Sequence, residues 1–182
     1  KYNSTDTQAL AMLLSQATGK SVTDYMVEKL YHPMGAESPG YWLTDSEGME
    51  MGFAGLNLTA RDYAKLGELY RNGGKFEGQQ LVPNEWVRAS TTPDGPHLLP
   101  GEDNPLSNYP WGYGYQWWVP SDKTNDFAAV GVYNQFIYVS PKNRMTVVML
   151  SANSGYGASP DAATDYEFEA VEFLRTLVEA QN

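Results

Sequence analysis

The serines of this chain are the first residues to examine for chemistry, because a serine hydroxyl becomes a good nucleophile only beside a base. In a Ser-x-x-Lys pair the lysine lies one helical turn from the serine and can take its proton. No serine here has a lysine three places later: Ser15 is followed there by Thr18, and Ser151 by Ser154. No Gly-x-Ser-x-Gly sequence occurs either. We therefore expect any attacking serine to be supplied by residues outside this chain.

The composition gives little support to metal, thiol or nucleic-acid chemistry. Cysteine is absent, and neither His32 nor His97 lies near carboxylates in a metal-ligand pattern, so we expect no metal and no cofactor. The formal net charge is −10, and no Lys/Arg cluster forms a stripe, so nucleic acid is not an expected partner. No apolar run is long enough to span a membrane. The lack of cysteine leaves the compartment open, and we lean only weakly to the bacterial periplasm or secretion.

The elements that must position any site are mainly helical over residues 1–110. Apolar residues at helical spacing predict helices that begin at Thr5 or Asp6, at Ser21, at Thr59 and after Pro83. The Gly- and Pro-rich stretches between them predict loops over 36–58 and 91–110. The residues expected to face inward from the first helix are Leu10, Leu13, Leu14 and Ala17.

From residue 111 the pattern changes to strands. Aromatic and β-branched runs predict an antiparallel sheet, and a final helix is expected from Ser159 with an apolar stripe that includes Leu174 and Val178. The fold class is therefore α+β, with a helical part (1–110) followed by a sheet and a C-terminal helix packed on it (111–182). The predicted strands are Tyr113–Val119, Phe127–Val130, Val132–Val139 and Met145–Leu150.

Ordered motifs along the chain carry a resemblance to a known family. The run "YNSTDTQALAMLLSQATGKSVTDYMVEKLYHPMG" (2–35) combines a Tyr-x-Asn-like start, two helices around a Thr-Gly-Lys-Ser turn, and a Pro-x-Gly close. It is followed by "GFAGLNLTARDYAKLGELYRNGG" (52–74), "WGYGYQWW" (111–118) and "FAAVGVYNQFIYVSPKNRMTVVMLSAN" (127–153). Together they resemble the β-lactamase-related serine hydrolases, and their residues are most similar to those of the branch of 6-aminohexanoate-dimer hydrolases and class C-like esterases. The resemblance implies an incomplete β-lactamase/transpeptidase-like fold.

The resemblance also implies a mechanism. In this family a serine attacks an amide or ester carbonyl, a lysine and the tyrosine of Tyr-x-Asn move protons, and the acyl-enzyme is later hydrolysed. Tyr2 would be that tyrosine. Because a free phenol titrates near ~10, it needs a neighbouring ammonium to act near neutrality. The chain would then be the C-terminal portion of the enzyme, inactive by itself. Its expected partners are a small amide or ester substrate and the missing N-terminal portion.

Two departures from the family pattern bear on the substrate. Ser4 stands where the family has asparagine, so a hydroxyl remains but the two amide donors are lost. The counterpart of the family's Lys-Thr-Gly strand lies near Gly131 and Val132 and has no lysine, threonine or serine. The backbone N–H of Val132 can still donate to an oxyanion, but the cation that holds a β-lactam carboxylate is absent. We therefore favour neutral or amine-bearing amides or esters over penicillins.

Several aromatic residues are candidates for the substrate pocket. Trp111 and Tyr113 are two residues apart at the start of the aromatic run 111–118, so on an extended chain they share a face, and they are expected to line an acyl pocket, although most of this aromatic cluster should be core. Tyr133 and Asn134 follow Gly131 closely and could reach the same pocket.

Two other kinds of protein remain possible. The loss of the Lys-Thr-Gly sequence and the serine at position 4 are also compatible with a binding module that keeps the scaffold without the chemistry. A separate chain that complements a serine-bearing partner is the third alternative. Without the strands that complete the family's sheet, we expect an unpaired edge and self-association.

Overall fold

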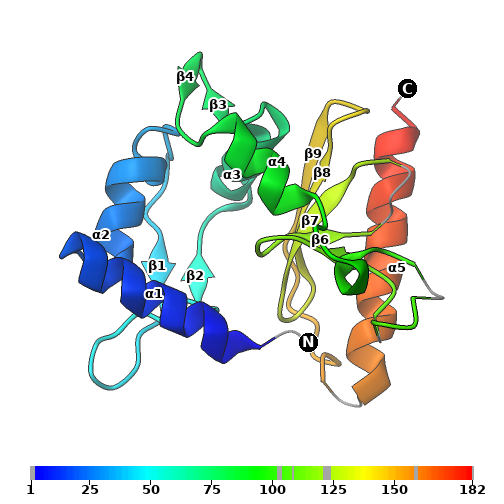
Figure 1. Cartoon of the computed structure of the whole chain (residues 1–182), viewed down its shortest axis with the longest axis horizontal. Coiled ribbons are helices and arrows are strands. Elements are labelled where there is room, and N and C mark those ends of the chain that lie inside the picture. The colour runs from blue at the N-terminus through cyan, green and yellow to red at the C-terminus, as the bar shows by residue number, and fades with distance from the viewer. Residues whose placement is uncertain (1–2, 102–103, 108, 121–123, 158–159, 182) are drawn as a thin grey trace. The chain divides into compact units, whose positions relative to one another are not determined.

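The computed structural model of the chain describes residues 3–101, 104–107, 109–120, 124–157 and 160–181, with side chains from residue 166 onward in the last range. Contacts divide the chain into two compact units, Lys1–Asp62 and Tyr63–Asn182. Figure 1 shows the first unit in blue to cyan and the second in green to red. The predicted division at residue 110 follows the change from helices to strands. The division by contacts comes earlier because helical residues after position 62 pack with the sheet.

The first unit begins with helix α1 (Ser4–Thr18), which ends at Gly19 in the left-handed conformation (φ 67°). The side chain of Asn3 caps this helix by accepting a hydrogen bond of 3.1 Å from Thr5 N. The predicted cap at Thr5 or Asp6 is therefore wrong by two or three residues. Leu10 and Leu13, predicted to face inward, are exposed. The periodicity located the helix but did not show what its apolar face would meet.

A second helical segment follows and is capped as predicted. The Ser21 hydroxyl accepts a hydrogen bond of 3.0 Å from Asp24 N, which satisfies a free amide of the first turn. The helix widens into a π-helical turn before Pro33. The elements here are α2 (Val22–Met26) and η1 (Val27–Tyr31).

The remainder of the first unit is a loop with short strands, as the Gly-rich sequence predicts. Strands β1 (Tyr41–Trp42) and β2 (Leu56–Asn57) form an antiparallel pair. The buried carboxylate of Asp62 accepts hydrogen bonds from Glu37 N (2.8 Å) and the Thr59 hydroxyl (2.8 Å). Asp62 N in turn donates to the Thr59 hydroxyl (3.2 Å). Asp62 is thus a structural cap for the next helix, as its position in the sequence indicated.

The second unit is built on an antiparallel sheet. Among the described residues its strands pair in the order β5-β6-β7-β8-β9, so each strand neighbours the next along the chain. This is the predicted meander, and the α+β fold class is confirmed. The strands are β5 (Gly112–Tyr113), β6 (Trp118–Val119), β7 (Phe127–Gly131), β8 (Gln135–Ser140) and β9 (Met145–Met149).

Two predicted strands are interrupted in the structure. The run from Tyr113 to Val119 is a hairpin, because Gly114 N donates to Trp117 O (2.8 Å) and Gln116 takes a positive φ of 67°. The strand predicted from Val132 starts only at Gln135, because the three residues before it form a turn.

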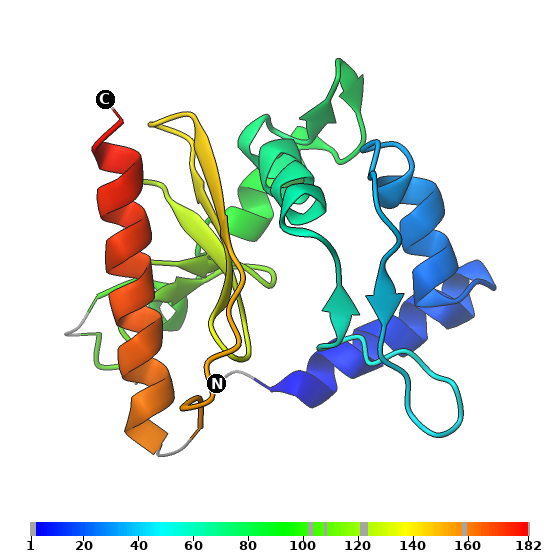
Figure 2. The same ribbon diagram turned by 180° about the vertical axis from the view of Figure 1, so that it is seen from behind.

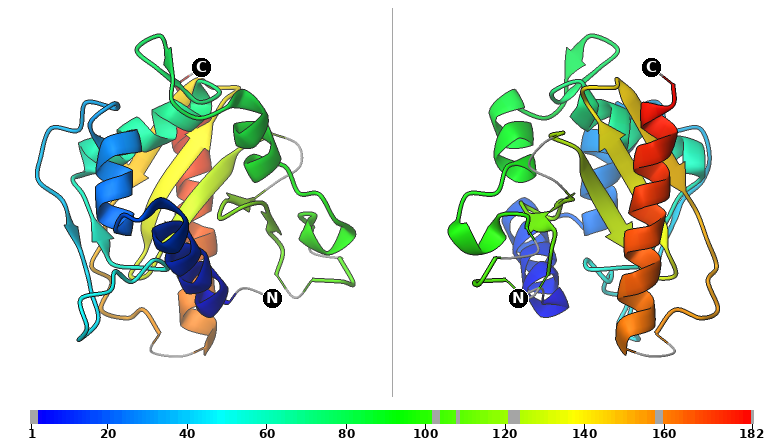
Figure 3. Two further views of the ribbon diagram at one scale, coloured as in Figure 1. Left: turned by 60° about the vertical axis from the view of Figure 1, so that its left-hand side comes forward. Right: turned by 90° about the vertical axis from the view of Figure 1, so that its right-hand side faces the viewer.

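Helices cover both faces of the sheet. On one face, Phe136 and Tyr138 pack against Leu174 and Val178 of α5 (Pro160–Glu179). Figures 2 and 3 show α5 running along this face. On the other face, residues of α3 (Ala60–Arg71) form a second cluster with the alternate strand residues. That cluster contains Tyr63, Leu66, Tyr70, Trp117, Phe127, Ile137 and Val139.

Gly67 allows α3 to lie directly on the sheet. A Cβ at this position would come within 2.4 Å of Thr146 Cγ2 and 2.9 Å of Ile137 Cγ2, closer than carbon atoms can approach. The helix tolerates glycine in its interior because the close approach buries the surrounding apolar side chains.

The sequence between the helices holds elements that were not predicted. A small hairpin, β3 (Lys75–Phe76) with β4 (Gln79–Gln80), follows α3, and a 3₁₀ turn, η2 (Pro96–Leu98), lies in the Pro-rich segment. Helix α4 (Asn84–Thr91) begins after Pro83 as expected and is joined to the β5–β6 hairpin by a hydrogen bond from Tyr115 N to Ser90 O (2.9 Å).

A buried polar cluster closes one end of the β7–β8 hairpin. The carboxylate of Asp126 accepts hydrogen bonds from the hydroxyls of Tyr138 (2.7 Å) and Ser140 (2.8 Å). Ser140 in turn accepts a bond from the amide of Asn143 (3.0 Å). Burial, and after it the hydrogen bond to Asp126, raises the pKa of the Tyr138 hydroxyl. This cluster lies at the end of the hairpin opposite the β7–β8 turn.

Candidate functional site

The β7–β8 turn contains half of the sequence-predicted site residues. Gly131 is the last residue of β7 and pairs with Gln135, the first of β8. Val132, Tyr133 and Asn134 connect them. The four consecutive residues Gly131 to Asn134 therefore form the end of β7 and a single tight turn.

Val132 is the first residue of this turn. The residue is 53% exposed. Within the described part of the chain, no residue accepts a hydrogen bond from its N–H. An unengaged amide at the end of a well-paired strand is a rigid donor, and such a donor can stabilise an oxyanion whatever side chain it carries.

The turn has an uncommon backbone. Tyr133 (φ 62°) and Asn134 (φ 66°) both have positive φ, a pattern typical of the type I′ turns that connect β-hairpins. Asparagine tolerates this conformation, whereas a bulky residue does so at a cost of roughly 1–2 kcal/mol. Strain of this kind persists only when surrounding contacts enforce it, and it gathers at functional sites.

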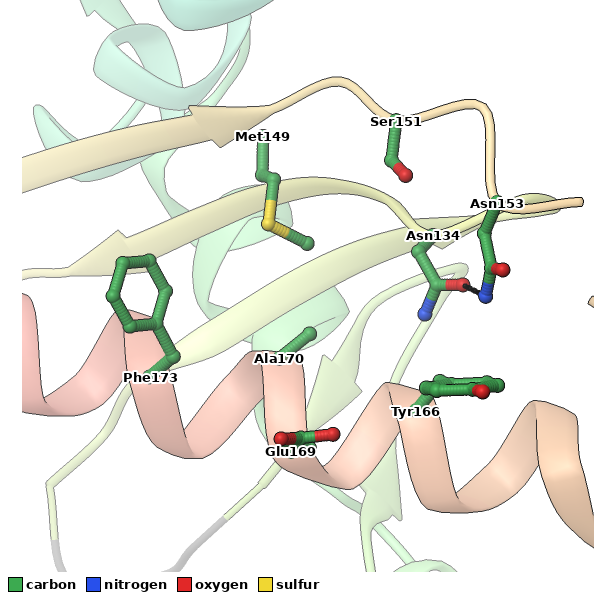
Figure 4. A pocket seen from close by; sticks show the side chains of 8 residues that line it. All are labelled: Asn134, Met149, Ser151, Asn153, Tyr166, Glu169, Ala170 and Phe173. Atoms are coloured by element: carbon green, nitrogen blue, oxygen red, sulfur yellow. Dashed lines mark hydrogen bonds between the residues drawn. The ribbon is translucent and has the colours of Figure 1, made fainter. Parts of the chain in front are cut away.

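Those contacts come from the segment that follows β9. The buried Asn134 side chain accepts a hydrogen bond of 2.8 Å from Asn153 Nδ2, drawn as a dashed line in Figure 4. Asn153 N also donates to Tyr133 O (3.4 Å). Neutral hydrogen bonds contribute about 1 kcal/mol each, so two of them are comparable with the strain at Tyr133. Asn153 was not foreseen from the sequence, because its partners lie about twenty residues earlier.

The same segment is fixed by Gln135. The side-chain nitrogen of Gln135 donates to Ser151 O, and its side-chain oxygen accepts from Ser151 N (3.1 Å). The two bonds resemble an additional pair of inter-strand hydrogen bonds. The side-chain oxygen of Asn153 accepts a hydrogen bond from Gly155 N (2.9 Å) and closes a small turn. The post-β9 segment is therefore rigid where it meets the β7–β8 turn.

Aromatic rings extend the site. Tyr133, 53% exposed, lies against Tyr156 with the ring centroids 5.6 Å apart. The carboxylate of Glu167 accepts hydrogen bonds from the hydroxyls of Tyr156 (3.4 Å) and Tyr109 (2.8 Å). Burial, followed by the hydrogen bond to Glu167, raises the pKa of the Tyr109 hydroxyl and keeps it protonated. Tyr133 thus offers one face to an incoming molecule from a supported position.

An open groove of about 480 Å³ lies beside the turn, between the ends of the strands and α5. Figure 4 shows the amides of Asn134 and Asn153 at one end of it and Met149 and Phe173 at the other, so the groove is polar at one end and apolar at the other. Its other lining residues are Ser151, Tyr166, Glu169 and Ala170.

The two predicted pocket aromatics differ in position. Trp111 is only 8% exposed and packs edge-on against Tyr109 (5.6 Å) and Phe168 (5.1 Å) in the core. Like most of the aromatic cluster, Trp111 belongs to the core, and it does not line an accessible pocket. Tyr113 is half-buried on β5, edge-on to Trp118 (4.8 Å). The alternation of Trp111 and Tyr113 does not continue beyond Tyr115, because the chain turns back at Gln116.

Two of the predicted site residues, Tyr2 and Ser4, belong to the first unit. Tyr2 lies outside the described residues. Ser4 is the first residue of α1, half-buried beside the capping Asn3. Over the described ranges, no group of three or more histidines and carboxylates could hold a metal ion. No helix of the described chain is long and apolar enough to cross a membrane.

Comparisons with known proteins show the family of the chain. A family model described as "Beta-lactamase" matches residues 1–172. The 6-aminohexanoate-dimer hydrolase of Paenarthrobacter ureafaciens is 26% identical over 153 residues, which are 84% of this chain and 39% of that protein. The predicted resemblance to this family is therefore confirmed.

Solved structures give the same result. The "Putative 6-aminohexanoate-dimer hydrolase from Bacillus anthracis" matches with a TM-score of 0.81 and 30% identity, over 98% of this chain and 44% of that one. A penicillin-binding protein homologue from Caulobacter crescentus shares the fold (TM-score 0.61, 14% identity, 79% of this chain and 51% of that one). The chain thus spans about half, or less, of the length of these relatives.

Proposed function

Because the chain belongs to the Beta-lactamase family, we propose that it is the C-terminal portion of a serine hydrolase that cleaves an amide or ester through an acyl-enzyme. The nucleophile and its lysine would come from the portion of the protein outside these 182 residues, since no Ser-x-x-Lys occurs within them. The matched relatives, of which the chain spans 39% and 44%, are long enough to carry that additional portion.

The Val132 N–H, from which no described residue accepts a hydrogen bond, is the observation that carries this proposal. Attack of a serine oxygen on a carbonyl carbon moves the π electrons onto the carbonyl oxygen, which becomes an oxyanion. A fixed N–H aimed at that oxygen stabilises the transition state, and removal of one such donor typically costs about 10²–10³ in kcat. The Val132 N–H follows the last residue of a paired strand, and no described residue accepts a hydrogen bond from it, so it is available to an oxyanion.

The remaining roles follow from the same mechanism. The serine proton passes to the lysine–tyrosine pair, with Tyr2 as the tyrosine, and then to the leaving amine or alcohol. Water, deprotonated by the same pair, attacks the acyl-enzyme and releases the acid. Ser4 would place one hydroxyl near the substrate.

The substrate class is set by what surrounds Val132. Gly131, Tyr133 and Asn134 provide no cation to hold a substrate carboxylate. A neutral or amine-bearing amide or ester fits better than a penicillin, with Tyr113 and Tyr133 as aromatic contacts. Because two relatives are named for the 6-aminohexanoate dimer, this dimer is the first amide to test.

A covalent serine probe tests the proposal directly. The full-length gene product is incubated with a fluorophosphonate, and intact mass is measured. One adduct per molecule is expected, and the 182-residue chain alone should stay unlabelled. Turnover of p-nitrophenyl acetate and of the 6-aminohexanoate dimer is then followed.

The variant Tyr2→Phe tests the proton relay. It should lower kcat about 10²–10⁴-fold, as loss of a general acid–base group does. A full-length protein that takes no adduct and hydrolyses neither compound would instead be a binding module on a hydrolase scaffold.

A further inference from the structure

We infer that Asn153 is a positioning residue for the oxyanion donor: by binding Asn134 and Tyr133, it holds the β7–β8 turn in its strained form and so fixes the direction of the Val132 N–H. The inference rests on the proposed function and deepens it, because it assigns a role to a residue to which the proposed mechanism gives none.

The contacts of Asn153 are arranged for this role. Its side-chain nitrogen donates to Asn134 Oδ1 (2.8 Å) and its backbone N–H to Tyr133 O (3.4 Å), so it grips both left-handed residues of the turn. Its side-chain oxygen accepts from Gly155 N (2.9 Å), which leaves the amide one orientation. Figure 4 shows the two asparagine amides facing each other across the end of the groove.

Asn153 can act as a brace because its own segment is anchored. The double contact between Gln135 and the Ser151 backbone ties the post-β9 segment to β8. The buried Asn134 side chain (5% exposed) has little room for another position. A change at residue 153 is therefore expected to act on the turn and not on the sheet.

The turn needs a brace because of Tyr133. A bulky residue at φ 62° prefers to leave the left-handed region. If it did, the peptide planes 132–133 and 133–134 would rotate. Because the pairing of Gly131 with Gln135 fixes both ends of the turn, the Val132 dihedrals would have to compensate, and the Val132 N–H in the preceding plane would tilt away from the carbonyl it serves. Glycine at position 133 would remove this preference.

The first measurement is steady-state hydrolysis of p-nitrophenyl acetate by the full-length gene product. Asn153→Ala should lower kcat about 10–100-fold with KM changed by less than about threefold, because the lost interaction is made in the transition state. Asn153→Asp, which keeps the acceptor for Gly155 N but cannot donate to Asn134, should lose nearly as much. The control is Asn143→Ala, at the opposite end of the hairpin, whose kcat should stay within about twofold of the wild type.

A double-mutant cycle separates positioning from general damage. In a Tyr133→Gly background the turn no longer resists its conformation, so adding Asn153→Ala should cost less than about threefold in kcat. A purely structural role would instead give the same loss in both backgrounds. Equal losses would overturn the inference.

Hydrogen exchange provides a readout that does not depend on activity. Asn153→Ala should speed deuterium exchange of the amides in peptide 131–136 by about tenfold or more, and Asn143→Ala should not. If the wild-type protein takes no serine probe, the proposed function fails, while exchange still decides whether Asn153 braces the turn. Unchanged exchange overturns the inference, and so does faster exchange with kcat within twofold of the wild type.

Discussion

The two compact units of this chain bury their side chains very differently. In the first unit, among the residues that the structure describes, only Met34 and Asp62 are buried, and α1 has no buried residue at all. In the second unit, apolar clusters fill both sides of the sheet. Burial of apolar surface is the main favourable term in folding. The comparison indicates that the second unit carries most of the chain's stability, while the first depends on hydrogen bonds and caps.

The largest effect that tests this contrast is expected from paired leucine truncations. Leu174→Ala removes a side chain that is 1% exposed in the α5 core and should lower the free energy of unfolding by about 3–4 kcal/mol. Leu13→Ala, on α1 and 62% exposed, should change it by less than ~0.5 kcal/mol. Urea unfolding followed by tryptophan fluorescence measures both. A similar cost for the two variants would break the comparison.

A smaller effect is expected from the buried carboxylates, one in each unit. Asp126→Ala leaves the hydroxyls of Tyr138 and Ser140 without their acceptor and should cost about 1–3 kcal/mol of global stability. Asp62→Ala removes the acceptor for Glu37 N and should instead act locally, with faster exchange at that amide and little change in the main transition. Exchange measured by NMR distinguishes the two. Global destabilisation by Asp62→Ala would show that the first unit contributes more than its burial suggests.

The smallest effect concerns ion pairs. The Arg71 guanidinium binds Glu68 through two contacts (2.8 and 2.6 Å) and, against the opposing effect of burial, holds the pKa of that carboxyl below its ordinary value of 4.5. The stabilisation is therefore present above pH 4.5 and is lost as pH falls through the lowered pKa. Glu68→Gln should cost about 0.5 kcal/mol at pH 7 and nothing at low pH.

The counterpart in the first unit is Glu28. Hydrogen bonds from Lys20 and Lys29 lower the pKa of its carboxyl to about 2, but all three side chains are exposed. Solvent screens such pairs, so Glu28→Gln should leave the free energy of unfolding unchanged at every pH. Parallel pH series of chemical unfolding check both variants. A pH-dependent loss for Glu28→Gln would contradict the comparison.

Local signals predicted much of the fold. Ser21 and Thr59 cap helices as their side chains suggest, and Gly19 ends α1 because it can take a positive φ. The hairpin of β8 and β9 follows from two β-prone runs around a turn-forming set. These features depend on residues that are neighbours in the sequence, which is why the sequence predicts them.

The site was predicted less well because it depends on distant contacts. The resemblance pointed to Val132 and its neighbours as candidates, yet the turn was taken for part of a strand. A left-handed Tyr133 goes against its own preference and is held by Asn153, which no local pattern connects to it. Trp111 was placed in a pocket, but it packs in the core against Tyr109 and Phe168, and the contact with Phe168 of the C-terminal helix is not visible in the local sequence pattern.

Gly67 carries a practical consequence for anyone who sets out to stabilise this protein. Replacement of a helical glycine by alanine is a standard improvement that gains up to about 1 kcal/mol in an exposed helix. Here the added methyl group would have to displace Thr146 and Ile137, so Gly67→Ala would force α3 away from the sheet. The most obvious candidate for engineering is therefore the position to leave alone.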